Sequence, residues 1–103
     1  MNLKYELSEL AQLDLEDIWL FTVKTWSINQ ANKYYDLIFE EIDAICKNPN
    51  IGRPIGNVKA NYKIRYIQSH LIVYKVKNNK IWIDRVLHKR MDFETKFNEG
   101  YPT

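Results

Sequence analysis

Residues 63–88 read KIRYIQSHLIVYKVKNNKIWIDRVLH, and this stretch decides the fold. Apolar and polar residues alternate in three runs, at 63–67, 70–77 and 80–88, which is the pattern of β-strands with one buried face. Asn78-Asn79 separates the last two runs and suits a two-residue hairpin turn, because Asn tolerates a positive φ. The sequence therefore predicts three consecutive strands in an antiparallel sheet.

The chain before this stretch supplies one more strand and two helices. Residues 3–7 alternate like a short strand, and the apolar spacing of residues 9–25 and 28–47 is helical. Ser8 and Ser27 are suitable N-caps for these helices. Because almost no linker separates the helices, they are expected to fold back as an antiparallel hairpin. The apolar side of the first helix is predicted from Leu10, Ala11, Ile18, Phe21 and Thr22, and Leu15, Trp19 and Trp26 widen it.

The resulting order is β-αα-βββ, in which a helical hairpin packs on one face of a small, largely antiparallel sheet. This is an α+β architecture, and 103 residues allow a single domain spanning 1–103. Residues 48–61, which contain most of the Pro and Gly, are predicted to form a surface loop. Residues 89–103 are polar and are interpreted as a partial helix or a tail.

Composition excludes several classes of protein. Cys46 is the only cysteine, so no intramolecular disulfide can form, and its helical position favours a small buried side chain. The N-terminus has no signal-peptide pattern and no apolar run reaches membrane length, so we expect a cytoplasmic protein without a membrane contact. The two histidines lack metal-ligand spacing, and no phosphate-binding loop is present, so neither a metal nor another cofactor is expected.

The formal net charge of +2 conceals a division along the chain. Residues 1–58 carry five basic and nine acidic side chains, whereas residues 59–103 carry ten basic and four acidic ones. In a structural interpretation, the basic residues form a solvated sheet edge that resists strand-to-strand aggregation. In a functional interpretation, they form a basic surface that binds an acidic protein or a phosphate backbone.

The last predicted strand places a charge toward the core. Strict alternation divides residues 81–88 into Ile81, Ile83, Arg85 and Leu87 on the core face and Trp82, Asp84, Val86 and His88 on the other. An inward Arg85 needs a partner, because an unpaired buried charge costs several kcal/mol. Two interpretations stay open, a structural ion pair with a helix carboxylate such as Asp14 or Asp17, and an arginine facing an anion or a partner.

Five short motifs resemble those of the ParE toxins in the RelE/ParE toxin–antitoxin superfamily. They match in order over roughly residues 3–92, and the closing one is the most specific. They are Ala11-x-x-Asp14-Leu15-x-x-Ile18, Trp26-Ser27-x-x-Gln30-Ala31-x-x-Tyr34 (with Ser27 where the family usually has Gly), Pro49-x-x-Gly52, Ser69-His70-x-Ile72-x-Tyr74 and Arg85-Val86-Leu87-His88-Lys89-Arg90-Met91-Asp92.

The resemblance implies a RelE/ParE-like fold and a toxin that traps DNA gyrase on cleaved DNA, blocking replication without chemistry of its own. It also implies neutralisation by a ParD-like antitoxin, whose ribbon-helix-helix part binds promoter DNA, so that the toxin meets this DNA only indirectly. A homodimer and a hetero-oligomer with the antitoxin both stay open. The residues expected to contact the target are Arg65, Arg85, His88, Lys89, Arg90, Met91 and Asp92.

A competing function comes from RelE-like relatives, which are ribosome-dependent mRNA endoribonucleases. Their chemistry needs a base, an acid and a cation for the developing phosphorane charge. His88 could act as the base or the acid, with Lys63, Arg65 and Arg85 stabilising charge. A binding module without toxicity is a third possibility.

The antitoxin is expected to bury apolar side chains against the helical hairpin and to run along the sheet. Trp19, Trp26 and Tyr35 are the candidate anchors, because large aromatic side chains dominate interface energies. The alternative is that all three have only a structural role, as ordinary core residues.

Overall fold

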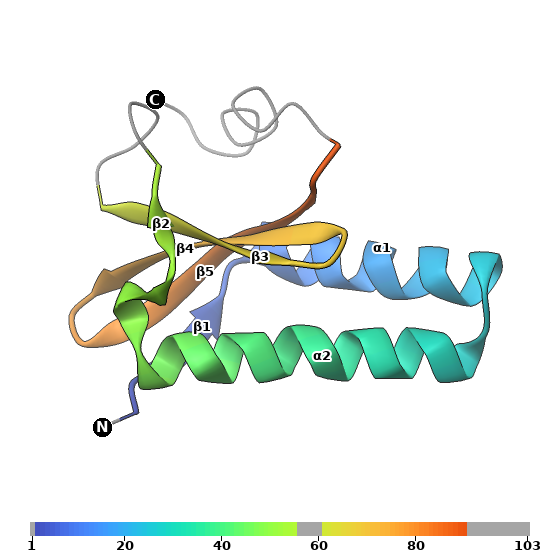
Figure 1. Cartoon of the computed structure of the whole chain (residues 1–103), viewed down its shortest axis with the longest axis horizontal. Coiled ribbons are helices and arrows are strands. Elements are labelled where there is room, and N and C mark those ends of the chain that lie inside the picture. Colours follow the sequence, from blue (N-terminus) through green and yellow to red (C-terminus); the bar gives the residue numbers. More distant parts are fainter. Residues whose placement is uncertain (1, 56–60, 91–103) are drawn as a thin grey trace.

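The computed structural model describes residues 2–55 and 61–90. Two long helices lie side by side against one face of a five-stranded sheet, and their connecting turn projects beyond the sheet (Figure 1). The order of elements confirms the predicted β-αα-βββ arrangement, with one short helix and one short strand added in the loop. The elements are β1 (Lys4–Leu7), α1 (Glu9–Thr25), α2 (Ile28–Lys47), η1 (Pro49–Ile51), β2 (Arg53–Pro54), β3 (Tyr62–Ile67), β4 (His70–Lys77) and β5 (Lys80–His88).

The strands lie in the order β1-β5-β4-β3-β2. All neighbours are antiparallel except β1 and β5, which are parallel, because the hairpin returns the chain to the far edge of the sheet before β2 begins. Asn78 and Asn79 have φ values of 54° and 59°, which confirms the predicted turn between β4 and β5.

Both helices begin at the predicted serine caps. The hydroxyl of Ser8 accepts from the amide of Ala11 at 3.0 Å, and that of Ser27 accepts from the amide of Gln30 at 3.0 Å. The Ser8 hydroxyl also donates to the carbonyl of Asp84 at 2.7 Å. This second bond fixes the start of α1 on β5.

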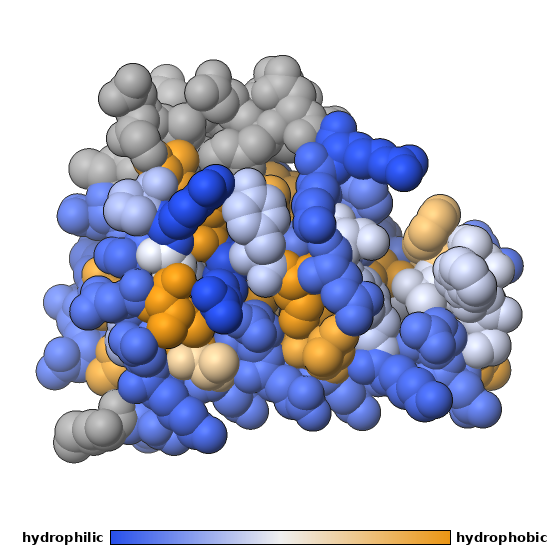
Figure 2. All heavy atoms as spheres, viewed as in Figure 1, coloured by the Kyte–Doolittle hydropathy of each residue, from blue (hydrophilic) through white to orange (hydrophobic). Residues whose placement is uncertain are grey.

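The main core lies between the helices and the sheet. It confirms the buried role predicted for Cys46, which is 4% exposed and whose thiol pKa is raised by burial. Figure 2 shows the apolar side chains set back between α2 and the sheet, with polar side chains along the outer border of α2. The buried members are Ala11, Leu15, Ile38, Ile42, Ile45, Cys46, Ile67, Ile72, Tyr74, Ile81, Ile83 and Val86.

The face assignment for the second half of β5 is wrong. Tyr74 pairs with Ile83 but Val73 pairs with Arg85, so Asp84 is an extra residue in a β-bulge. One extra residue reverses the alternation, so that Val86 packs toward the helices and Leu87 packs in a second cluster on the opposite face. We call this the helix-free face, because none of the helices in the described residues covers it (Figure 1). This second cluster contains Ile55, Ile64, Leu71, Val73 and Leu87.

The hydrogen-bonded contact between β2–η1 and β4 depends on a close approach at Gly52. The buried hydroxyl of Tyr74 accepts from the amide of Gly52 at 2.9 Å and donates to the carbonyl of Pro49 at 2.7 Å. A Cβ atom on Gly52 would lie 2.4 Å from this hydroxyl and 2.7 Å from the ring. The glycine is therefore required for space.

Candidate functional site

Arg85, the charge predicted to point inward, pairs with Asp14 of α1. Its Nε and Nη2 atoms donate to the two carboxylate oxygens of Asp14 at 2.8 and 3.0 Å. Oδ2 of Asp14 also accepts from the amide of Val86 at 2.9 Å. The two side chains are only 13% and 15% exposed. The predicted structural ion pair is confirmed with Asp14 as the partner, and the pair ties α1 to β5 just beyond the bulge.

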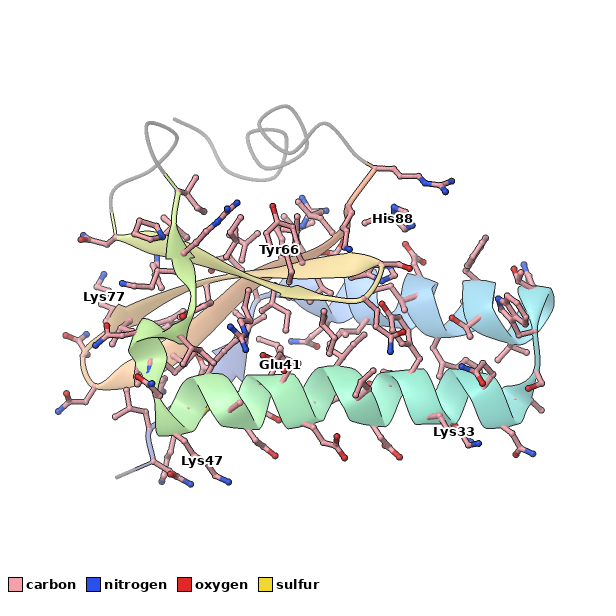
Figure 3. The ribbon with its side chains drawn as sticks, in the orientation of Figure 1. Lys33, Glu41, Lys47, Tyr66, Lys77 and His88 are labelled. Atoms are coloured by element: carbon pink, nitrogen blue, oxygen red, sulfur yellow. The ribbon has the colours of Figure 1, made fainter. Side chains whose placement is uncertain are left out.

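Arg65 forms a separate ion pair with the other helix. Its guanidinium donates to the carboxylate of Glu41 on α2, and Nη1 donates to the carbonyl of Ile51 at 3.4 Å. In Figure 3 Glu41 points from α2 toward the sheet. Arg65 thus connects β3 to α2 while Arg85 connects β5 to α1. Their principal contacts are therefore within the chain.

The ribonuclease candidates do not converge. Lys63 pairs with Tyr74 and His88 pairs with His70, so the two lie four residues apart along β4 and on the strands at either side of it. Four residues span roughly 13 Å at the rise of a β-strand, and β3 and β5 are about 10 Å apart across the sheet. Nδ1 of His88 accepts from the amide of Arg90 at 3.0 Å. A base, an acid and cations around one phosphate would need much shorter separations.

His70, Tyr34 and His88 form a polar cluster at the end of β4 and β5. The hydroxyl of Tyr34 shares a hydrogen bond with Nδ1 of His70 at 2.6 Å and donates to the carbonyl of Ile67 at 3.3 Å. The rings of His70 and His88 meet edge to face with centroids 5.1 Å apart. Burial, reinforced by His88 and opposed by Asp14, lowers the pKa of His70 to about 4. His70 is therefore neutral at physiological pH.

The pKa of His70 makes stability depend on pH. In the unfolded chain the imidazole takes up a proton near pH 6.5, whereas in the folded chain it does so only near 4. The unfolded state therefore binds more protons between these values, and stability falls as pH is lowered from about 6.5 to about 4. His70→Asn keeps a hydrogen-bonding atom near Tyr34 but has no imidazole to titrate. Between pH 6.5 and 4 its free energy of unfolding should therefore fall by about 1–2 kcal/mol less than that of the original chain. Urea unfolding of both proteins across the range checks this, and equal losses would contradict it.

Two grooves border the helical hairpin. Trp26 and Phe21 are 75% and 67% exposed and line the first groove, with Tyr34 and the two histidines beyond them. Phe21 was expected on the buried side of α1, but it points into this groove. The second groove contains the half-buried Trp19 and Tyr35, and Nε1 of Trp19 donates to Oδ1 of Asn32 at 3.1 Å. The structure therefore separates the predicted anchors into two places.

Lys89 and Arg90 are exposed at the end of β5, and Met91 and Asp92 lie outside the described residues. The Lys89 ammonium lies 6.0 Å from the ring centroid of Tyr66, and the Arg53 guanidinium lies 5.5 Å from the same centroid. Sequence reasoning missed Tyr66 and Arg53. Strict alternation of β3 places Tyr66 on the face opposite to Arg65, which was the available signal.

Three of the contacts described above join pairs of the sequence motifs. Asp14 of the first motif binds Arg85 of the closing motif. Tyr34 of the second binds His70 of the middle-strand motif, and Gly52 of the loop motif binds Tyr74 of the same strand. The polar motif residues therefore hold the helices, loop and sheet together.

Comparisons with known proteins agree with this architecture. The family model described as the ParE toxin of the type II toxin–antitoxin system parDE matches residues 5–93. Toxin ParE1 of Mycobacterium tuberculosis (strain CDC 1551 / Oshkosh) is 37% identical over 95 residues, covering 91% of this chain and 97% of the relative. Toxin ParE1 of Caulobacter vibrioides (strain CB 15) is 35% identical over 88 residues, covering 85% and 91%.

Two solved structures share the fold. The chromosomal ParDE system from P. aeruginosa gives a TM-score of 0.73 at 18% identity, covering 84% of this chain and 95% of that one. The RelBE2 toxin–antitoxin complex from Mycobacterium tuberculosis gives 0.67 at 14% identity, covering 86% and 100%. None of the helices in the described part of the chain is long and apolar enough to span a membrane.

Proposed function

The chain belongs to the ParE toxin family of type II toxin–antitoxin systems, and on this premise we propose that it inhibits DNA gyrase and is neutralised by a ParD-like antitoxin. The family match over residues 5–93 is the observation that carries this proposal. The separation of Lys63 from His88 also favours a toxin that acts by docking over a ribonuclease. Inhibition then consists of holding the cleaved gyrase–DNA intermediate.

Within the predicted target surface, Lys89 and Arg90 are the residues to test first. Arg65 and Arg85 engage Glu41 and Asp14, so removing either arginine would disturb the fold as well as any target contact. Lys89 and Arg90 are exposed at the end of β5, where their charges can meet an acidic partner. The target surface proposed here is therefore centred on the last residues of β5 and the turn after it.

A gyrase assay tests the proposal. Purified chain at micromolar concentration is expected to slow supercoiling and to yield linear plasmid after protein denaturation, because gyrase is held on cleaved DNA. Lys89→Gln with Arg90→Gln should raise the concentration for half-inhibition about 10-fold, equivalent to about 1.4 kcal/mol. The matched control is Lys33→Gln with Lys47→Gln, which removes two charges from the side of α2 that faces away from the sheet (Figure 3).

Unchanged supercoiling at micromolar chain would refute gyrase inhibition. Cleavage of translated mRNA in a ribosome assay, lost with His88→Ala and Arg65→Ala, would instead support the endoribonuclease. Equal effects of the two double variants on gyrase would refute the surface at Lys89 and Arg90 while leaving gyrase as the target.

For the antitoxin, we propose docking in the groove beside Trp26. Both solved relatives come from toxin–antitoxin systems, and this groove holds the most exposed aromatic surface of the hairpin. Asp14 in this groove is already neutralised by Arg85 and the second acidic residue, Asp17, is exposed, so the part of the groove beside Trp26 and Phe21 accepts an apolar segment. The C-terminal segment of the antitoxin would order on this surface as it binds.

Trp26→Ala is expected to weaken binding of the antitoxin segment by roughly 30-fold or more while leaving unfolding unchanged, because an exposed anchor contributes to the interface and little to the fold. Trp19→Ala should weaken the fold as well, since it breaks the bond to Asn32 that joins the helices. Trp82→Ala on the helix-free face is the matched aromatic control. Isothermal titration calorimetry measures the loss of antitoxin binding, and urea unfolding measures the loss of stability. An unchanged affinity of the folded Trp26→Ala variant would contradict this docking position.

A further inference from the structure

The helix-free face of the sheet carries a row of cations beside aromatic rings. The register places Tyr62, Lys75 and Trp82 across neighbouring strands on this face. Tyr66 lies on the same side, because its partner Leu71 belongs to the second cluster. Among the described residues, we define the cation–aromatic face as Arg53, Tyr62, Tyr66, Lys75, Lys80, Trp82 and Lys89.

The rings and the cations on this face are in direct contact. The Lys75 ammonium lies 5.0 Å from the ring centroid of Tyr62, and the Lys80 ammonium lies 5.2 Å from the ring of Trp82. Tyr66 is approached by Arg53 and Lys89. Each of the three aromatic side chains of the face therefore has at least one positive charge beside it.

The charge of this face contrasts with that of the helical layer. Lys4 and Lys77 add to the cations of this face, whereas its described acidic side chains are Glu6, which is level with Trp82, and Asp84, which is hydrogen-bonded to Tyr62. Lys80 is partly neutralised by Glu6 at 3.4 Å. The acidic residues of α1 and α2 lie in the other layer, where Asp14 and Glu41 pair with Arg85 and Arg65. The charge division along the sequence therefore becomes only in part a division between two layers of the molecule.

The Tyr66 end of the face is the most accessible. Tyr66 is 46% exposed, and Arg53 and Lys89 are both exposed. Figure 3 shows Tyr66 on the side of the sheet away from Glu41 and α2. A cation–π contact in water is weak, so a stacking ligand can displace either long side chain from the ring while the charge stays nearby.

We propose that the cation–aromatic face binds single-stranded nucleic acid, with a base stacked on Tyr66 and backbone phosphates on Arg53 and Lys89. Proteins that bind single strands combine a positive surface that follows the backbone with aromatic rings on which bases stack. An acidic protein would use the cations but would not require a ring beside each one. This binding is separate from gyrase inhibition and does not rest on it.

Fluorescence anisotropy with a labelled single-stranded DNA of about 12 nucleotides tests the inference on the full chain. Affinity should fall as salt is raised from about 50 to about 200 mM, because phosphate neutralisation releases counterions. Arg53→Gln with Lys89→Gln should weaken binding roughly 10-fold and reduce the slope of log affinity against log salt by about 1.4. Tyr66→Ala should weaken binding about 5- to 150-fold, whereas Tyr66→Phe, which keeps the ring, should bind like the original chain.

Lys33→Gln with Lys47→Gln is the charge-matched control and should leave affinity unchanged. Absence of binding at about 50 mM salt would overturn the inference. Equal losses for the two double variants would also overturn it, because binding would then follow net charge alone. Poly-glutamate that competes as well as the oligonucleotide would assign the face to an acidic protein instead. Urea unfolding of each variant excludes loss of fold as the cause of a lost signal.

Discussion

Asp14→Ala is expected to lower the free energy of unfolding by about 3–5 kcal/mol, the range for removing one partner of a buried ion pair. The change leaves the guanidinium of Arg85, which is only 13% exposed in its present position, without its carboxylate. It also removes the acceptor for the amide of Val86, which is held at 2.9 Å. Urea or thermal unfolding followed by circular dichroism measures the loss.

Two further variants separate charge from hydrogen bonding at this pair. Asp14→Asn removes the charge but keeps an oxygen for Val86, so it should cost less than Asp14→Ala. Replacing both Asp14 and Arg85 with leucine should cost much less than either single alanine, because no charge is then left buried. A loss below about 1 kcal/mol for Asp14→Ala would contradict the importance of the pair, since that value is typical of an exposed salt bridge.

Gly52→Ala is expected to cost about 2–4 kcal/mol. The new methyl group would lie 2.4 Å from the Tyr74 hydroxyl and within 2.8 Å of its ring, so the ring or the loop must move. Either movement weakens the hydrogen bonds that the Tyr74 hydroxyl makes with the amide of Gly52 and the carbonyl of Pro49. Polar groups left without a partner in a buried region destabilise the fold. Chemical unfolding gives the magnitude.

The background of Tyr74 provides the control for Gly52. Tyr74→Ala removes the ring, so adding Gly52→Ala to this variant should destabilise it little further. In Tyr74→Phe the ring atoms at 2.7 and 2.8 Å remain, so Gly52→Ala should still destabilise, but by less than in the original chain. Asn50→Ala in the same loop is exposed and should change stability by less than about 0.5 kcal/mol. Equal costs of Gly52→Ala in all backgrounds would show that crowding against Tyr74 is not the cause.

Elements whose signals are local were predicted closely. The strand and helix runs, both serine caps and the Asn78-Asn79 turn each depend on residues a few positions apart, and all are present. The ion pair of Arg85 with a helix carboxylate was also among the predicted alternatives. A helical hairpin and an alternating strand leave few ways to bury both apolar faces, so the α+β class followed from the same information.

The arrangement of the candidate site was less predictable. The bulge at Asp84 shifts one strand by a single residue, and no local signal marks it, because residues 80–88 alternate equally well with and without it. Arg65 and Arg85 were expected to contact the target, but they bind Glu41 of α2 and Asp14 of α1. Tyr66 and Arg53 come together only because β2 pairs with β3, which no local pattern in the sequence indicates.

Hydrophobic periodicity, capping residues and turn residues, which the sequence contains explicitly, thus determined the fold class and the bounds of the helices and main strands, and the ordered motifs indicated the family by resemblance. Tertiary structure alone decided which charges pair, that Arg65 and Arg85 form separate ion pairs with the helices, and that Lys75, Lys80 and Lys89 share one face of the sheet with aromatic rings. The physical reason is the distance along the chain over which each interaction acts. Backbone geometry is set by neighbours within one or two turns, whereas an ion pair such as Asp14–Arg85 joins residues 71 positions apart and depends on the final register of the sheet.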